Sequence, residues 1–120
     1  MTKKILIVED EKTLQIALKT KFQKDQELEI LQAFNGKEGL EILAKEPIDL
    51  ILLDIVMPVM DGIEMLKRVR QEKKYDGVKI IILTNSSSFE KSFQLAKVEY
   101  LIKSNYSLDE ILTKIKEALN

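Results

Sequence analysis

The sequence contains no cysteine and no histidine. Without cysteine the chain has no disulfides, no thiol catalysis and no cysteine-ligated zinc. Without histidine it has no Ser-His-Asp or Cys-His triad, no histidine metal site and no histidine acting as general acid or base. Any chemistry must therefore use carboxylates, hydroxyls and lysines, together with an oxygen-ligated hard cation such as Mg²⁺.

The chain also lacks long apolar runs and an excess of charge of either sign. Its longest apolar runs span only a few residues, whereas a membrane span needs about 20, and no secretory signal follows Met1. With 19 Lys and Arg against 20 Asp and Glu the net charge is −1, so no strong field attracts nucleic acid or an anionic membrane. We expect a soluble, cytoplasmic protein without membrane insertion or direct nucleic-acid binding.

Short β-branched apolar runs alternate with amphipathic segments along the 120 residues, a length typical of one domain. Three runs are nearly continuous in Ile, Leu and Val, as in parallel strands buried on both faces. Two weaker, more alternating runs are typical of sheet edges. The predicted strands are Ile5–Val8, Leu28–Phe34, Leu50–Leu53, Ile80–Leu83 and Val98–Ile102.

Apolar residues at helical spacing predict a helix after each strand. The stripes are Leu14, Ala17, Leu18 and Phe22; Leu40, Leu43 and Ala44; Ile63, Leu66 and Val69; Phe89, Phe93 and Ala96; and Leu108, Ile111, Leu112, Ile115 and Leu119. Three starts have the spacing of a capping box. These are Asn35 with Glu38, Ser87 with Glu90, and Ser107 with Glu110.

A strand followed by a helix, five times over, predicts an α/β fold: a (βα)5 doubly wound parallel five-stranded sheet, or flavodoxin-like three-layer sandwich, over residues 1–120. Right-handed crossovers make 2-1-3-4-5 the leading strand order. Ligands of such sheets bind beyond the carboxyl ends of the strands, where the winding reverses between strands one and three. Candidate site residues are therefore those that end the strands.

Three carboxylates follow these two strands: Glu9 and Asp10 after the first, and Asp54 after the third. Because neighbouring strands lie about 4.8 Å apart, these side chains should converge. Two carboxylates about 4 Å apart repel by about 4 kcal/mol at an effective dielectric of about 20, so such a cluster takes up protons or holds a cation. Three hard oxygen donors suit Mg²⁺. The alternative is a solvated acidic loop without a metal.

Thr84 ends the fourth predicted strand, and Lys103 follows the fifth. A hydroxyl and an ammonium at the same edge as the carboxylates suit the binding of an anionic group such as a phosphoryl. Taken singly, each is more simply a strand threonine or a surface lysine. Taken with the carboxylates, they indicate one site with complementary chemistry.

The loop after Asp54 reads Asp-Ile-Val-Met-Pro-Val-Met-Asp-Gly, ending at Gly62. Pro58 fixes φ and removes a backbone donor, and Asp61-Gly62 predicts a turn before the third helix. The acidic pair, this loop, the threonine and the lysine fall in the order found in the receiver domain of two-component response regulators. The chain resembles that family over its whole length, from the first strand to the last helix.

The resemblance implies that Asp54 is the phosphoacceptor, which takes a phosphoryl group from a sensor histidine kinase or phosphotransfer protein to form an aspartyl phosphate in a phosphorelay. Lys103 would pair with that phosphoryl group, and the Thr84 hydroxyl would hydrogen-bond to it. The resemblance also implies a Mg²⁺ site. Its ligands would be Glu9, Asp10, Asp54 and the backbone carbonyl of Val56.

Tyr100 matches the aromatic residue that turns inward in this family when the threonine, here Thr84, moves toward the phosphate. Taken alone, Tyr100 is more simply a half-buried strand tyrosine. By resemblance, phosphorylation favours one of two conformations of helix four, strand five and helix five. That surface would meet a downstream protein or output domain, or form a phosphorylation-dependent homodimer; otherwise its charges are a solvated face. Its residues here would include Lys91, Gln94, Lys97, Glu99 and Lys114.

The chain departs from the family's pattern beside the site. Ser104 stands where the family usually has a proline after a cis peptide, so either a trans peptide shifts Lys103 or the site tolerates the strain of a cis bond. Asn85 stands where the family commonly has Ala or Gly, which would narrow access to the phosphoacceptor. Val56 and Ser86 occupy positions that tune phosphate lifetime, and neither side chain orients an attacking water well. Slow self-dephosphorylation is therefore predicted.

Two other function classes stay open. One is a phosphate-independent interaction module on the same fold, favoured if Asn85 or Ser104 has disabled the switch. The other is a Mg²⁺-dependent phosphoaspartyl hydrolase. Enzymes of that class carry an Asp-x-Asp motif after strand one. In this sequence Lys12 stands two residues after Asp10, and the chain has no cap insertion. Flavin or dinucleotide binding is disfavoured because no glycine-rich loop follows strand one.

Ile16 lies opposite the apolar stripe of the first helix. Single exposed apolar residues are common, but helix one lies beside the phosphorylation site in the family, so Ile16 is also a candidate for kinase docking. The chain ends soon after the last predicted helix. We therefore expect no DNA-binding or catalytic output domain within it.

Overall fold

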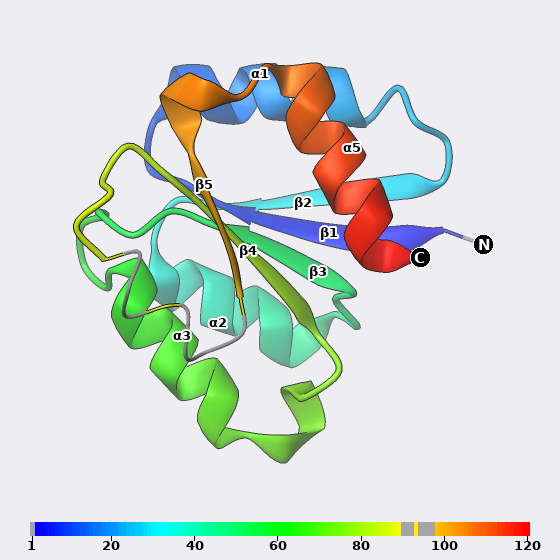
Figure 1. The fold of residues 1–120 in the computed structure, drawn as a ribbon. Coiled ribbons are helices and arrows are strands. Elements are labelled where there is room, and N and C mark those ends of the chain that lie inside the picture. Colours follow the sequence, from blue (N-terminus) through cyan, green and yellow to red (C-terminus); the bar gives the residue numbers. More distant parts are fainter. Residues whose placement is uncertain (1, 90–92, 94–97) are drawn as a thin grey trace.

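The computed structural model of the protein describes residues 2–89, 93 and 98–120. Its five strands form one parallel sheet in the predicted order, β2-β1-β3-β4-β5 (Figure 1). The strands are β1 (Lys3–Val8), β2 (Leu28–Ala33), β3 (Leu50–Leu53), β4 (Lys79–Thr84) and β5 (Glu99–Ile102). As predicted, the two strands with the weaker apolar runs, β2 and β5, lie at the edges of the sheet.

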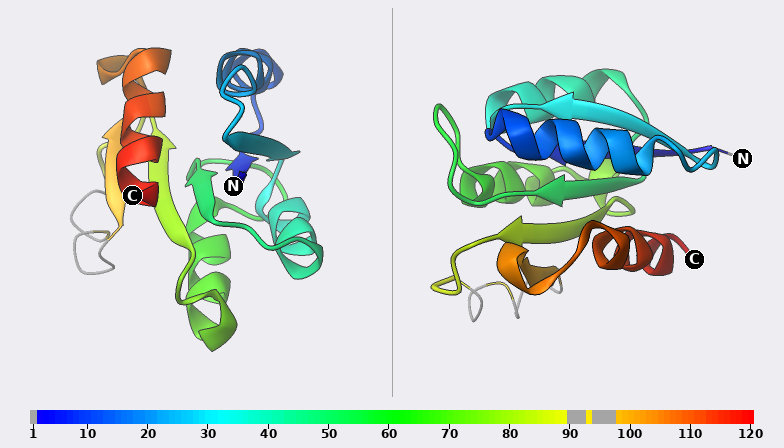
Figure 2. Two further views of the ribbon diagram at one scale, coloured as in Figure 1. Left: turned by 90° about the vertical axis from the view of Figure 1, so that its right-hand side faces the viewer. Right: turned by 90° about the horizontal axis from the view of Figure 1, so that it is seen from above.

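Two layers of helices cover the sheet (Figure 2): α1 and α5 lie on one face, and α2 and α3 on the other. The helices are α1 (Lys12–Phe22), α2 (Gly36–Lys45), α3 (Gly62–Gln71) and α5 (Leu108–Leu119). The predicted helix over Phe89, Phe93 and Ala96, with its Ser87–Glu90 cap, depends on residues 90–92 and 94–97, which lie outside the described residues. No helix in the described part of the chain is long and apolar enough to cross a bilayer.

Alternate residues of the central strands point to opposite faces of the sheet and build two apolar clusters. In β1, Ile5 and Ile7 join the cluster beneath α1 and α5, while Leu6 and Val8 join the cluster beneath α2 and α3. All four residues of β3 are buried. Burying one such side chain contributes about 1.5–3 kcal/mol. Because helices cover both faces of the sheet, residues that point to either face are apolar, and these strands appear in the sequence as continuous apolar runs.

The capping box at the start of α5 forms as predicted. The hydroxyl of Ser107 accepts a hydrogen bond from the backbone N–H of Glu110 at 3.1 Å, and the Glu110 carboxylate accepts one from the Ser107 N–H at 2.9 Å. These bonds favour the charged carboxylate, so the pKa of Glu110 lies below its ordinary value of 4.5. The box thereby satisfies two backbone donors that the helix itself leaves free.

The caps of α2 and α3 differ from expectation. Asn35 caps α2 through a 2.9 Å bond from the Glu38 N–H, but the Glu38 carboxylate accepts from Phe34 instead of Asn35, so the box is not reciprocal. Asp61 caps α3 through a 2.9 Å bond from the Glu64 N–H, a cap that the sequence analysis did not single out. Both side chains supply an acceptor at a helix start, where N–H groups lack partners.

Replacing Ser107 with alanine is expected to lower the free energy of unfolding by about 1 kcal/mol, because one backbone donor of α5 loses its acceptor. Urea denaturation at neutral pH measures this change. The loss should shrink in acid, since the contribution of Glu110 is present above its unfolded-state pKa and disappears as the pH falls through its lowered folded-state pKa. Ser104→Ala, at an exposed serine, is the control; an equal loss in both variants would contradict the cap's role.

Candidate functional site

The carboxyl ends of β1 and β3 bring three carboxylates together, as predicted. One side-chain oxygen from each of Glu9, Asp10 and Asp54 lies within 4.8 Å of the others. The Asp54 N–H donates to the Val8 carbonyl at 3.0 Å, which keeps the two strand ends level. Glu9 and Asp54 are only 3% and 6% exposed, whereas Asp10 faces solvent. Hard oxygen donors with one open side fit Mg²⁺, which retains several waters when bound.

Lys103 bridges two of these carboxylates from the end of β5. Its Nζ lies 2.6 Å from Glu9 Oε1 and 3.1 Å from Asp54 Oδ2. Burial by itself lowers the pKa of Lys103, but its hydrogen bond to Glu9 and the charges of both carboxylates outweigh burial and raise that pKa. The ammonium therefore stays charged and partly offsets the repulsion between the two acids.

Glu9 responds to the same surroundings. Burial raises the pKa of its carboxyl, which disfavours the charged form, while the Lys103 ammonium and the Glu11 N–H oppose that shift. The Glu11 N–H donates to Glu9 Oε2 at 3.0 Å, so each carboxylate oxygen of Glu9 has a donor. The charge of Asp54 adds a further upward contribution to the pKa of Glu9. A bound cation would favour the charged forms of both carboxylates.

A cavity of about 350 Å³ opens beside Asp54. Its lining residues come from the end of β4 and from the segments that follow β3, β4 and β5. They are Asp54, Val56, Thr84, Asn85, Ser86 and Lys103. The cavity brings the predicted hydroxyl and ammonium to the predicted carboxylate, and the exposed Asn85 forms part of its wall.

Thr84 and Tyr100 are both tied to Ser86 in the loop after β4. The buried Thr84 hydroxyl accepts from the Ser86 N–H at 3.4 Å. The Tyr100 hydroxyl donates to the Ser86 carbonyl, and its ring packs against Phe93 with 5.5 Å between centroids. This half-buried tyrosine of β5 therefore contacts the loop that lines the cavity.

The family model of the response regulator receiver domain matches residues 5–116 of this chain. The chain belongs to the response regulator receiver domain family. It is 36% identical to sporulation initiation phosphotransferase F of Bacillus subtilis over 122 residues, which cover 99% of this chain and 95% of that protein. It is 34% identical to the transcriptional regulatory protein CrdR of Helicobacter pylori over 122 residues, covering 100% of this chain and 56% of that protein.

A solved structure supports the same assignment. The response regulator protein TrrA of Thermotoga maritima, in complex with Mg²⁺ and BeF, is 36% identical, with a TM-score of 0.85 and coverage of 98% of this chain and 100% of TrrA. The function of the protein is thus that of a receiver domain in two-component signalling. Receivers bind Mg²⁺, accept phosphoryl groups and interact with histidine kinases or phosphotransfer proteins and with output domains.

This receiver domain reaches its site geometry without the family's usual proline after the lysine. No peptide bond in the described chain is cis, so Lys103 and Ser104 are joined by a trans peptide. The segment Lys103–Asn105 forms a 3₁₀ turn, and the Lys103 ammonium still contacts both Glu9 and Asp54. The loop at Ser104 is therefore trans, and it keeps the lysine at the site.

The loop after β3 packs closely against the start of α3 in this receiver domain. The Ile55 N–H donates to Asp54 Oδ1 at 2.8 Å, and the Gly62 N–H donates to the Ile55 carbonyl at 2.8 Å. A Cβ at Gly62 would lie 2.1 Å from the Asp54 carbonyl oxygen. The glycine is therefore required by close approach of two backbones, whereas the sequence indicated only a turn. Between them, Val59 has a φ of 67°, unusual for a β-branched residue.

Four polar side chains are buried in the described part of the receiver domain: Glu9, Gln15, Asp54 and Thr84. Three of them were predicted from the sequence as site residues, and Gln15 was not. The spacing of Gln15 from Leu18 and Phe22, the other buried residues of α1, placed it on the apolar face. A glutamine in that position was the available signal, because a buried amide needs hydrogen-bond partners.

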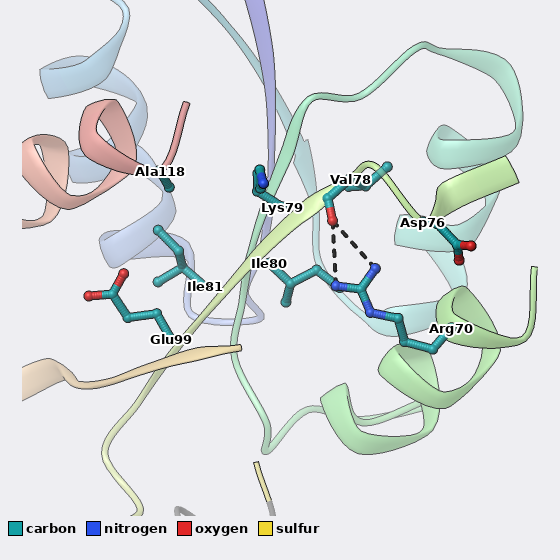
Figure 3. Close-up of a pocket in the computed structure, with 8 residues that line it drawn as sticks. All are labelled: Arg70, Asp76, Val78, Lys79, Ile80, Ile81, Glu99 and Ala118. Atoms are coloured by element: carbon teal, nitrogen blue, oxygen red, sulfur yellow. Dashed lines mark hydrogen bonds between the residues drawn. The ribbon is translucent and has the colours of Figure 1, made fainter. Parts of the chain in front are cut away.

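A larger cavity, of about 530 Å³, lies at the other end of β4, where the strand begins (Figure 3). Two of its charged side chains have partners within the protein. The Arg70 guanidinium donates to the Val78 carbonyl at 3.4 Å, and Glu99 pairs with Lys114 at 3.3 Å. This cavity lies away from the carboxyl ends of the strands, so size alone does not mark the functional site.

Replacing Gly62 with alanine is expected to lower the free energy of unfolding by about 1–3 kcal/mol or more, because the added Cβ overlaps the Asp54 backbone. Gly77→Ala is the matched control, since a Cβ there meets nothing within 4 Å and should change stability by less than about 1 kcal/mol. Thermal and urea denaturation of both variants measure the difference. Equal tolerance of the two alanines would show that the backbones at Gly62 do not approach as described.

Proposed function

We propose that this protein is a cytoplasmic receiver, acting as one unit over residues 1–120, in which Asp54 accepts the phosphoryl group in a Mg²⁺-dependent reaction. The observation that carries the proposal is the Lys103 ammonium, which contacts both Glu9 and Asp54, while Lys103 and Asp54 line the 350 Å³ cavity. A buried carboxylate with an ammonium beside it and open space before it is arranged to receive an anionic group.

The proposed reaction is a displacement at phosphorus. A carboxylate oxygen of Asp54 attacks the phosphoryl group of a phosphohistidine; a P–O bond forms, and the P–N bond to the imidazole breaks. The Lys103 ammonium pairs with the phosphoryl oxygens and offsets the charge they carry. Thr84 supplies a hydroxyl from the cavity wall as a hydrogen-bond donor to the same group.

Glu9, Asp10, Asp54 and the Val56 carbonyl would hold the metal ion. When bound, Mg²⁺ offsets the negative charge shared by the carboxylates and the transferring phosphoryl group. The three carboxylate oxygens within 4.8 Å of one another support this assignment, as does the similarity to TrrA, whose structure was solved with Mg²⁺ and BeF.

The proposed switch involves Thr84 and Tyr100, which both bond to Ser86 beside the cavity. A phosphoryl group that attracts the Thr84 hydroxyl would change this loop and thereby bias the surface formed by β5, α5 and the helix expected between β4 and β5. On that surface, Glu99 and Lys114 form an ion pair. Lys91, Gln94 and Lys97 lie outside the described residues.

Two partner surfaces are proposed. The surface around β5 and α5 would bind a downstream protein or output domain, or a second phosphorylated copy of the chain. On α1, Ile16 is 66% exposed, as predicted, and belongs to the proposed docking surface for the sensor histidine kinase or phosphotransfer protein. In this proposal the phosphoryl donor and the phosphorylation-dependent partner bind through different elements, although α1 and α5 cover the same face of the sheet.

Acetyl phosphate with Mg²⁺ is expected to add one phosphoryl group to the wild-type protein, measured as intact mass. Asp54→Asn should remain unmodified, because an amide is a far weaker nucleophile than a carboxylate, and EDTA should prevent the addition to the wild type. The matched control is Asp61→Asn, because Asp61 is an acid on the same loop and its side chain caps α3. This variant should be modified normally. A phosphoryl group that persists in Asp54→Asn would refute the assignment, and the absence of any adduct would favour an interaction module.

Val56→Asn is expected to shorten the lifetime of the aspartyl phosphate by about tenfold, since an amide at the cavity wall can orient an attacking water; a true general base contributes about 10²-fold or more. Val59→Asn is the control, because Val59 is equally apolar and lies on the same loop with 78% exposure but does not line the cavity. Loss of phosphoprotein over time, followed by intact mass, measures both rates. A lifetime unchanged or lengthened in Val56→Asn would contradict this explanation.

A further inference from the structure

Gln15 lies in the interior between α1 and the carboxyl ends of β1 and β2, with only 1% of its surface exposed. Its Nε2 lies 2.8 Å from the Ala33 carbonyl oxygen, 3.0 Å from that of Glu9 and 3.2 Å from that of Ile7. Three acceptors around one nitrogen require that nitrogen to be the amide donor. Gln15 thus joins one helix to two neighbouring strand ends.

Gln32 of β2 fixes the other end of this amide. Its Nε2 donates to Gln15 Oε1 at 2.8 Å and to the Gln15 backbone carbonyl at 2.9 Å. Both polar atoms of the Gln15 side chain therefore have partners, and its orientation is determined. A buried amide bonded in this way is rigid, because each broken bond would leave a polar group without water or a partner.

The Glu9 carbonyl lies just past the last residue of β1, where the pairing between β1 and β2 ends with the bond from the Glu9 N–H to the Ala33 carbonyl at 3.0 Å. Gln15 donates to both of these carbonyls. The backbone of Glu9 is thereby held by Gln15 and Ala33, while its carboxylate is held by Glu11 and Lys103. The turn that carries Glu9 and Asp10 is anchored from the protein interior.

We propose that Gln15 is a positioning residue for the acidic site: it fixes the backbone of Glu9, so that the carboxylates of Glu9 and Asp10 face Asp54 at the separation a divalent cation needs. The proposal rests on the proposed function of these three acids as the Mg²⁺ site. Gln15 touches no ligand atom of a carboxylate; it acts through the main chain of a ligand residue. Groups that orient metal ligands in this indirect way typically contribute 10–100-fold to metal affinity.

The test is the dissociation constant for Mg²⁺, measured by calorimetric titration of the full chain, in Gln15→Met. Methionine keeps an unbranched side chain of similar length but donates no hydrogen bond. The dissociation constant is expected to rise by about 10-fold or more under conditions where urea denaturation shows the variant to be folded. Phe22→Leu is the matched control, because Phe22 is buried on the same face of α1, and its loss should lower stability without changing Mg²⁺ affinity.

A Gln15→Met protein that loses stability as Phe22→Leu does, but binds Mg²⁺ as tightly as the wild type, would overturn the proposal, because Gln15 would then be merely structural. If Gln15→Met does not fold, the Mg²⁺ dissociation constant of Gln32→Leu tests the proposal instead. This variant removes only the bonds that orient the Gln15 amide and should raise the dissociation constant by a smaller factor; an unchanged constant would overturn the proposal.

The two hypotheses fail in different ways. If Asp54→Asn binds Mg²⁺ as well as the wild type, the acids are not the metal site, and both the proposed function and the role of Gln15 are refuted. If Asp54→Asn weakens binding and Gln15→Met does not, only the positioning role is refuted.

Discussion

The crowding of carboxylates at one edge of a parallel sheet is the constraint on which the rest of the site depends. β1 and β3 are hydrogen-bonded neighbours whose ends are level, so the backbones that carry Glu9 and Asp54 are held side by side. At contact distance, two such charges repel by about 4 kcal/mol at an effective dielectric of about 20. Lys103 partly offsets that repulsion. A site in which the charge of Lys103 partly offsets the charges of the carboxylates responds strongly to added charge. A phosphoryl group adds such charge.

The strands and their order followed from sequence because burial on both faces leaves a local signature, continuous Ile, Leu and Val runs, and because few topologies join five parallel strands. Convergence of Glu9, Asp10 and Asp54 then followed from topology alone. Gln15 was not singled out from the sequence, and Gly62 was predicted only as part of a turn, since the role of each depends on backbone atoms from other parts of the chain. Such contacts leave no periodic signal in the sequence.

The lysine loop shows how a departure from a family pattern can be absorbed locally. A trans peptide and the 3₁₀ turn Lys103–Asn105 bring the ammonium to the carboxylates with serine in place of the usual proline. The long, flexible lysine side chain allows this loop conformation, because its charged group can reach the same point from a range of backbone positions. Receiver chemistry thus constrains the position of the ammonium more tightly than the backbone conformation of the loop that carries the lysine.

Among the described residues, the sheet separates two apolar clusters that share no buried side chain. Alternation along β1 sends Ile5 and Ile7 to one side and Leu6 and Val8 to the other. Changes in packing on the two sides should therefore combine nearly additively, as they do for groups without common partners. A substitution that alters the packing beneath α1 and α5 should therefore leave the packing beneath α2 and α3 largely unchanged.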